Sequence, residues 1–317
     1  MDLCLKSSSP FLGNYDSCYE SFRENVSSCP CVEDQTQKEP GDVSILSILH
    51  DVSQSYVMSG DGSSKISAEI EEQKRGQVMF AKHAIIKEKL YLFGTGTKIA
   101  ILFECSVIEI AEKLIYNRDE RAEALSITEG SQALICFSEN SNECEIFDGR
   151  TSRRTLNSTF THDLGGLGYY KGQPTSVGCQ STNNKKTETL TASGWTTLPD
   201  FPENYASHNL IGLKNGGMIL VGGYNAVGYF SRIWQLKDNR WTKLGDLQTA
   251  HGLGSAIFTG NSIYVFPGGP KTENEHAIQR IDFTAGEDFL QTQIIGYHSG
   301  WYKYPILLET SAYYCRY

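Results

Sequence analysis

Residues 208–247, HNLIGLKNGGMILVGGYNAVGYFSRIWQLKDNRWTKLGDL, indicate the architecture of this chain more clearly than any other segment. They contain four short runs of apolar, β-branched and aromatic residues. Turn residues separate the first two runs at Asn215-Gly216 and the last two at Asp238-Asn239. Runs of this length and composition, bounded by glycine and asparagine, predict β-strands joined by tight turns. The stretch therefore predicts one four-stranded sheet.

The hairpin that begins this stretch recurs along the chain at a nearly constant interval. An apolar strand, a charged or glycine turn and a second apolar strand occur six times. The turn markers are Glu88, Gly130, Gly172, Gly216, Gly260 and Glu309, which lie 42, 42, 44, 44 and 49 residues apart. A regular period of this length, built from strands, predicts a β-propeller with one blade per period.

Both ends of the chain carry incomplete repeats. Strand-like runs at 43–49, 55–62 and 65–72 precede the first full repeat, and PILLE (305–309) and SAYYC (311–315) supply two more strands at the other end. We expect these halves to form one shared blade, because that arrangement leaves no gap in the ring. The prediction is an all-β, six-bladed propeller that N- and C-terminal strands close.

The predicted domains follow from these repeats. Residues 1–41 form a short, polar, cysteine-bearing leader without strand alternation, and residues 42–317 form the propeller. The predicted blades are a composite blade of 42–72 with 301–317, and then blades at about 73–117, 118–159, 160–202, 203–249 and 250–300.

Two glycines and two tryptophans mark the quoted repeat. Gly222 and Gly223 end its second strand, Trp234 lies 11 residues after Gly223, and Trp241 lies 7 residues after Trp234. Glycine permits a positive φ and a close approach of backbones near the centre of a ring. The aromatic side chains are expected to fill the wedge between neighbouring blades.

This pattern resembles the kelch repeat, and residues 43–317 resemble a divergent kelch-type propeller of the galactose-oxidase-like superfamily. The glycine doublet recurs as Gly268 and Gly269, and Trp195 ends the third repeat, but the other repeats keep the pattern only in part. The resemblance implies radial four-stranded sheets whose loops form binding surfaces, and it implies no particular chemistry. No BTB or F-box module is expected, because residues 1–41 are too short for the first and show no amphipathic helix for the second.

Composition and net charge reduce the classes of partner that the chain is expected to bind. The net charge is −9, which disfavours non-specific binding to nucleic acid or anionic lipid. No apolar run reaches the roughly 18–20 residues that a membrane span needs. The charged run NRDERAE (117–123) lies between two predicted blades, where we expect solvated charges.

Cysteines and glycosylation sequons indicate the compartment. Cys136 and Cys144 flank a hairpin turn, so their side chains are expected to form a cross-strand disulfide. Asn25 and Asn157 each begin an N-x-S/T sequon. Together with the cysteine-rich leader these features favour an extracellular, secreted protein. The alternative is a cytoplasmic protein, because no secretory signal is visible at the start.

Four histidines could have a ligand-binding role instead of a structural one. His83, His162, His208 and His251 shortly precede the first strands of successive blades and are expected near one rim of the central channel. Such a ring could bind a metal or a polar ligand. We expect instead that the histidines hydrogen-bond loops between blades, because no ligand-like spacing accompanies them. No cofactor, metal or catalytic residue is predicted, and nothing places a tyrosine and a cysteine together as a galactose-oxidase-like copper site needs.

Three functions remain open on these observations. The first is a non-enzymatic, extracellular module that binds a protein or a glycan. The second is an intracellular kelch adaptor that presents a bound protein to a larger complex such as a ubiquitin ligase. The third is a propeller-channel enzyme that acts on sugars, which fold analogy alone supports.

Overall fold

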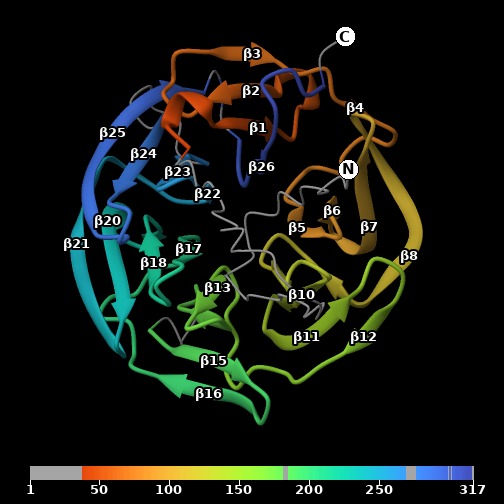
Figure 1. Ribbon diagram of the computed structural model, residues 1–317. Helices are drawn as coiled ribbons and strands as arrows, with labels where there is room; N and C mark the ends of the chain where they lie inside the picture. The colour runs from red at the N-terminus through yellow and green to blue at the C-terminus, as the bar shows by residue number, and fades with distance from the viewer. Residues whose placement is uncertain (1–37, 181–184, 269–275, 299, 301, 316–317) are drawn as a thin grey trace, which may run out of the picture.

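The apolar runs of the sequence form strands that assemble into six sheets around a common axis (Figure 1). The computed structural model describes residues 38–180, 185–268, 276–298, 300 and 302–315. The predicted all-β, six-bladed propeller is confirmed. Asn25 and Gly269 lie outside the described residues, as does almost all of the leader.

Blades 1 to 3 follow in chain order, and each runs from an inner to an outer strand. Blade 1 contains β5 (Lys82–Ile86), β6 (Lys89–Phe93), β7 (Gly96–Phe103) and β8 (Ser106–Arg118), with β4 (Glu71–Glu72) parallel to β8 at its outer edge. Blade 2 contains β9 (Glu123–Ile127), β10 (Gln132–Ser138), β11 (Ser141–Phe147) and β12 (Ser152–Arg154). Blade 3 contains β13 (Gly166–Tyr170), β14 (Gln173–Val177), β15 (Thr187–Thr191) and β16 (Gly194–Leu198).

Blades 4 and 5 continue the ring, and blade 6 closes it. Blade 4 contains β17 (Asn209–Gly212), β18 (Met218–Val221), β19 (Tyr224–Asn225), β20 (Gly228–Lys237) and β21 (Arg240–His251). Blade 5 contains β22 (Ser255–Thr259), β23 (Ser262–Phe266), β24 (Ala277–Phe283) and β25 (Phe289–Tyr297). Blade 6 contains β26 (Ile306–Glu309), β1 (Ser44–Ile48), β2 (Tyr56–Ser59) and β3 (Lys65–Ser67).

The second strands of blades 1, 2, 4 and 5 explain why the sequence there contains continuous apolar runs rather than alternating ones, whereas β14 of blade 3 reads QPTSV. In β18, Met218 and Leu220 face blade 3, whereas Ile219 and Val221 face blade 5. Successive side chains of a strand point to opposite faces, and both faces of a blade are covered by neighbours. One hydrophobic cluster of described residues lies at each of the six blade-to-blade interfaces.

Ring closure uses strands from both ends of the chain. β26 pairs antiparallel with β1 from Ile306 to Glu309, so one C-terminal strand completes a sheet of three N-terminal strands. The expected second C-terminal strand at 311–315 is wrong, because residues 312–315 form a turn. This turn brings Cys315 to Cys105 in the β7–β8 hairpin, and a disulfide joins them across 210 residues.

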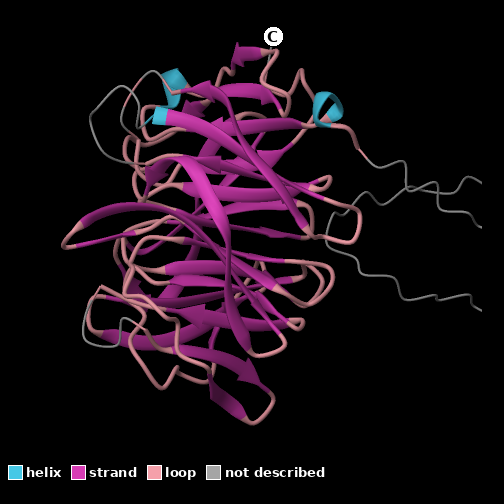
Figure 2. Cartoon of the chain, turned by 90° about the vertical axis from the view of Figure 1, so that its left-hand side faces the viewer, coloured by secondary structure: helices cyan, strands magenta, loops and turns pink. Residues whose placement is uncertain are grey.

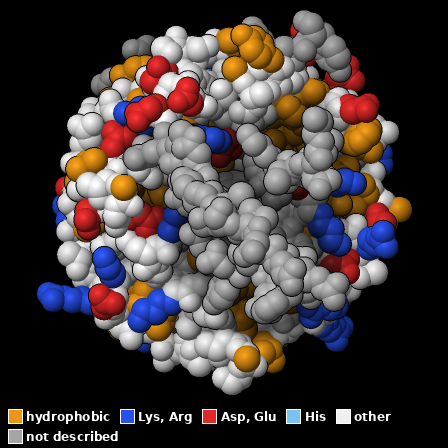
Figure 3. Space-filling view, in the orientation of Figure 1, with side chains coloured by type: hydrophobic (Ala, Val, Ile, Leu, Met, Phe, Trp, Pro, Cys, Tyr) orange, Lys and Arg blue, Asp and Glu red, His pale blue; other side chains and the backbone are white. Residues whose placement is uncertain are grey.

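The propeller has two different faces. We call the side where the second strand of a blade leads to the third, and where the fourth leads to the next blade, the loop face. The opposite side, with the tight hairpins, is the turn face. In Figure 2 the short 3-10 helix η2 (Val52–Gln54) marks the loop face and η1 (Pro40–Asp42) marks the turn face. Basic and acidic side chains are both scattered around the rim of the face shown in Figure 3.

Candidate functional site

A belt of backbone hydrogen bonds surrounds the channel mouth on the loop face. The N–H of Leu164 donates to the carbonyl of Arg121, Ser207 to Leu164, Leu253 to Ser207, and Tyr304 to Leu253. Each donor lies in the connection that enters its blade. The four donors share a left-handed backbone, with φ of 54° at Leu164, 49° at Ser207, 58° at Leu253 and 50° at Tyr304.

The side chains of this belt close the channel mouth. Leu164, Ala206 and Tyr304 form a buried cluster against which Phe80, Tyr224 and Leu253 pack. Left-handed conformations are rare for leucine and tyrosine and persist only where surrounding contacts impose them. Two of the four donors are leucines and the others are Ser207 and Tyr304, so no recurring residue type predicts the belt positions from the sequence.

A polar cluster lies directly below the belt. Lys82 Nζ donates to Glu123 Oε1 at 3.1 Å and sits 3.5 Å from the centre of the Tyr304 ring. The Tyr304 hydroxyl lies 2.9 Å from Ser207 Oγ. Burial raises the pKa of Glu123, although the Lys82 ammonium opposes that shift. The expectation of solvated charges at 117–123 is therefore wrong for Glu123, and also for Arg118, which forms a fully buried ion pair with Glu145.

The predicted histidines are spread between blades rather than gathered around one ligand site. The His162 ring lies 2.7 Å from Gly178 O and 3.1 Å from Glu188 Oε1, and both atoms are acceptors. His208 and His251 are also buried. No group of three or more metal-ligating side chains occurs among the described residues.

Burial keeps most of these histidine rings neutral. It lowers the pKa of His83 and of His251 to about 4, and that of His208 to about 3. A further histidine, His298, has its pKa lowered to about 3 by burial, and its Nδ1 lies 2.9 Å from the Tyr56 hydroxyl. The expected hydrogen bond to a loop is made by His162, whereas neither ring nitrogen of the buried His251 has a hydrogen-bond partner in the described part of the chain.

The glycine doublet makes room for two of these histidines. Gly222 and Gly223 have φ of 67° and 109°. A Cβ on Gly222 would lie 2.8 Å from His251 Nε2, and one on Gly223 would lie 3.1 Å from His208 Cβ. Gly268 lies even closer to its neighbour, since a Cβ there would be 1.7 Å from Leu253 O.

The tryptophans join neighbouring blades through a repeated hydrogen bond. Trp241 Nε1 donates to Pro199 O at 3.1 Å, and Trp195 Nε1 donates to Leu156 O at 3.0 Å. Each tryptophan is the second residue of an outermost strand, and each acceptor follows the outermost strand of the preceding blade. Trp241 and Trp234 also pack edge-on against Phe201, with ring centres 5.0 and 5.7 Å from it.

A second inter-blade contact, which sequence reasoning missed, starts from the third strand of a blade. Glu145 accepts hydrogen bonds from the backbone N–H groups of Ile115 and Tyr116 in the preceding blade. Glu188 accepts in the same way from Thr159 and Phe160. In blade 5, Gln279 bonds to both backbone groups of Thr249.

In blade 4 the matching third-strand residue is Trp234, which packs on Phe201 instead of accepting a hydrogen bond. Two residues earlier, Arg232 donates to Glu203 Oε1 and, at 2.7 Å, to the Tyr205 hydroxyl, and an open depression adjoins these side chains. We call the adjoining hollow the blade-4 depression. It is lined by Lys185, Pro202, Glu203, Asn204, Tyr205, Asn225, Val227, Phe230 and Arg232.

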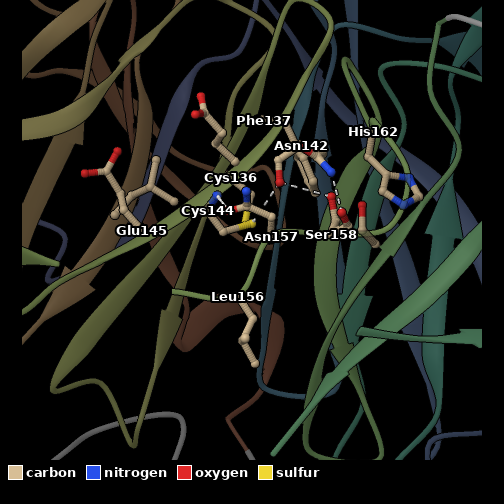
Figure 4. Close-up of a disulfide and its surroundings, with 12 residues drawn as sticks. Cys136, Phe137, Asn142, Cys144, Glu145, Leu156, Asn157, Ser158 and His162 are labelled. Atoms are coloured by element: carbon tan, nitrogen blue, oxygen red, sulfur yellow. Dashed lines mark hydrogen bonds between the residues drawn. A yellow bond between two sulfur atoms is a disulfide. The ribbon is translucent and has the colours of Figure 1, made fainter. Parts of the chain in front are cut away.

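The hairpin disulfide and the second sequon lie together near the β10–β11 turn of blade 2 (Figure 4). Cys136 and Cys144 are paired opposite each other on β10 and β11 and are joined by a disulfide. Asn157 is exposed, and its Oδ1 accepts a hydrogen bond from the N–H of Cys144 at 3.3 Å.

Comparison with known proteins supports the fold alone. No protein-family model matches the sequence, and no curated protein matches it. Among solved structures, that of YjhT superposes with a TM-score of 0.63 at 13% sequence identity. The match covers 76% of this chain and 91% of YjhT. No helix in the described part of the chain is long and apolar enough to cross a membrane.

Proposed function

We propose that this chain is a kelch-type, non-enzymatic binding module of the extracellular space, which recognises a protein or glycan through its loop face. The blade-4 depression is the observation that supports this most. It combines aromatic, amide, acidic and basic side chains on loops that a rigid ring holds in place. Loops on a rigid scaffold are the usual carriers of recognition, and sites of mixed polarity are the usual binding sites.

Covalent chemistry supports the extracellular part of the proposal. Two disulfides link described cysteines, and one of them joins the C-terminal end to blade 1. Stable structural disulfides are typical of oxidising compartments. Asn157 is exposed at its sequon, so its side-chain amide is accessible for a glycan.

One experiment tests the binding function without a known ligand. The full chain is immobilised and probed with a printed glycan array and with a library of secreted proteins. Two variants of single surface residues are compared with it, Asn225→Asp on the loop face and Lys171→Glu on the turn face. We expect Asn225→Asp to reduce the captured signal and Lys171→Glu to leave it unchanged. A signal that only the turn-face variant reduces contradicts the loop-face assignment.

The compartment is tested separately on protein purified from its natural source. Peptide mapping without reduction is expected to show Cys105–Cys315 and Cys136–Cys144 linked, and deglycosylation is expected to lower the mass. Reduced cysteines together with a co-purifying cullin complex would favour the intracellular adaptor instead.

The channel-enzyme alternative has one observation in its favour, the Lys82–Glu123 pair beneath Tyr304. A carboxyl with a raised pKa beside a buried cation is an arrangement that acid–base catalysis uses. Release of nitrophenol from p-nitrophenyl glycosides, abolished in Glu123→Gln, would support this alternative over a binding module.

A further inference from the structure

The blade-4 depression adjoins an ion pair between two consecutive blades. In blades 2, 3 and 5 a third-strand side chain hydrogen-bonds to the backbone of the preceding blade. At the matching position blade 4 has Trp234, and Arg232, two residues earlier, pairs with the Glu203 carboxylate that follows blade 3. An ion pair that stays partly exposed contributes little to stability and leaves both side chains accessible. Arg232 and Glu203 retain 39% and 24% of their side-chain exposure.

The polar groups of the depression are donors and acceptors fixed side by side. Asn225 Nδ2 donates to the carbonyl and to the Oδ1 of Asn204, both at 3.2 Å, and Asn225 Oδ1 accepts from Val227 N at 2.8 Å. A sugar hydroxyl donates and accepts at once, so adjacent amide, guanidinium and carboxylate groups match it well. These internal bonds hold the side chains before a ligand arrives, which lowers the entropic cost of binding.

An apolar wall stands beside these polar groups. Val227 is 89% exposed at the tip of its loop, and Phe230 stacks on Tyr205 with ring centres 4.1 Å apart. The stack fixes the position of Phe230, which lines the depression together with Val227 and Pro202. The C–H surface of a pyranose ring is apolar and packs against such groups, whereas its hydroxyls face the polar side.

The charges of the lining nearly cancel, which suits a neutral ligand. Glu203 and Arg232 are paired, whereas Lys185 donates to the neutral carbonyl Pro202 O at 2.8 Å and keeps its positive charge. A cationic ligand would meet no unpaired carboxylate here, and a sulfate or phosphate would meet one unpaired ammonium instead of the cluster of cations that usually binds it.

We propose that the blade-4 depression binds one neutral pyranose residue of a glycan. The inference deepens the proposed binding function and rests on it. The hydroxyls contact the Asn204, Asn225 and Arg232 side, and the ring packs on Val227 and Phe230.

The test uses four defined probes, the methyl glycosides of glucose, galactose, mannose and N-acetylglucosamine, with the full disulfide-bonded chain. Saturation-transfer NMR detects binding, and titration gives the affinity. Val227→Glu and Arg232→Lys are expected to weaken the best probe about tenfold, the effect of losing one charge-assisted or apolar contact. Gln180→Ala is the matched control, because Gln180 lies on the same face but bonds to the Tyr224 hydroxyl near the channel mouth.

Each outcome decides the proposal. Binding that Val227→Glu and Arg232→Lys weaken, with an unchanged Gln180→Ala variant, supports it. If Gln180→Ala alone weakens binding, a glycan is still the ligand, but the blade-4 depression is not its binding site. No saturation transfer from any probe, with a secreted protein captured on the loop face, overturns the glycan class and leaves the binding function intact. Neither glycoside nor protein bound contradicts both proposals. Thermal melting verifies that Val227→Glu folds, as expected for a residue this exposed.

Discussion

For single residues, the double glycine shows two separate requirements for glycine at one position: a positive φ, and no room for a Cβ. Gly222 has a φ of 67°, and a Cβ there would lie 2.6 Å from His251 O. Gly130 has a similar φ of 74°, but a Cβ there meets nothing within 4 Å. The two positions therefore separate the conformational cost of alanine from the cost of overlap with a neighbour.

We predict that Gly130→Ala lowers the free energy of unfolding by about 1 kcal/mol, the usual cost of a left-handed alanine. Gly222→Ala is expected to cost at least about 2 kcal/mol more, because the rigid His251 backbone must move. Urea denaturation followed by tryptophan fluorescence measures both. Equal losses for the two variants would show that His251 is not packed against Gly222.

The sequence predicted the physical role of Gly222 and Gly223 but not the residues that fill the space they leave. A positive φ and close approach follow from local chemistry at a strand end. The neighbours His251 and His208 are set by how two blades pack, and no local pattern encodes that. The same limit explains Glu123, which looks solvated in a charged run and is enclosed only once the ring closes.

For the strands, the tryptophans show how one blade contacts the next by a hydrogen bond and by ring packing. Trp241 combines the hydrogen bond to Pro199 O with ring contacts to Phe201. We predict that Trp241→Ala lowers the free energy of unfolding by about 3 kcal/mol, from a lost inter-blade contact and the cavity it leaves. Trp241→Phe is the comparison, because it keeps an aromatic ring beside Phe201 but loses the hydrogen bond, at about 1 kcal/mol, together with part of the indole surface.

Urea denaturation of the two Trp241 variants measures this difference. A loss below about 1 kcal/mol for Trp241→Ala would mean that its contacts with blade 3 contribute little. A Trp241→Phe loss as large as the alanine loss would show that a phenyl ring at this position contributes nothing, and that the effect comes from the Pro199 hydrogen bond and the rest of the indole.

The strand predictions were right where burial on both faces of a strand requires apolar residues throughout. They were wrong at residues 311–315. The runs in β10, β18 and β23 are apolar throughout because each lies between two neighbouring blades. SAYYC has strand-forming residues, but the chain turns so that Cys315 reaches Cys105. A disulfide across 210 residues cannot be read from spacing, whereas the Cys136–Cys144 pair could be, because a predicted hairpin already placed it.

At the scale of the whole molecule, the two disulfides act on very different lengths of chain. Cys105–Cys315 spans 210 residues and Cys136–Cys144 spans 8. In the chain-entropy account a cross-link stabilises by restricting the unfolded chain, and more so for a longer loop.

We predict that the Cys105→Ser, Cys315→Ser double variant loses about 5 kcal/mol of unfolding free energy and the Cys136→Ser, Cys144→Ser variant about 2.5 kcal/mol. Denaturation in urea without reductant measures both. The reverse order would show that contacts around the hairpin disulfide, not loop length, set its contribution.

The buried histidines make the stability of the ring depend on pH. Burial lowers the pKa values of His83, His208, His251 and His298 to about 3 or 4, whereas an unfolded histidine titrates near 6.5. Between these values the unfolded chain binds more protons than the folded one. Stability is therefore complete above about pH 6.5 and is lost as the pH falls towards 4, by at most about 1.4 kcal/mol per pH unit for each histidine.

Between pH 6.5 and 5, other titrating groups change the free energy of unfolding less than the four histidines do. Carboxyls whose pKa is lowered, such as Glu188 and Asp282, lose their contribution only below about pH 4.5. Glu123 has a raised pKa and acts in the opposite direction, because its folded form holds a proton longer, but it is one group against four. We expect urea denaturation at pH 7.5, 6.5 and 5.5 to show a small change above 6.5 and a steep loss below it. His251→Asn is expected to reduce the slope by up to one proton, since its ring contributes one of the four. A stability that stays constant from pH 7.5 to 5.5 would mean that the rings take up protons without unfolding, and that the interfaces between blades admit water.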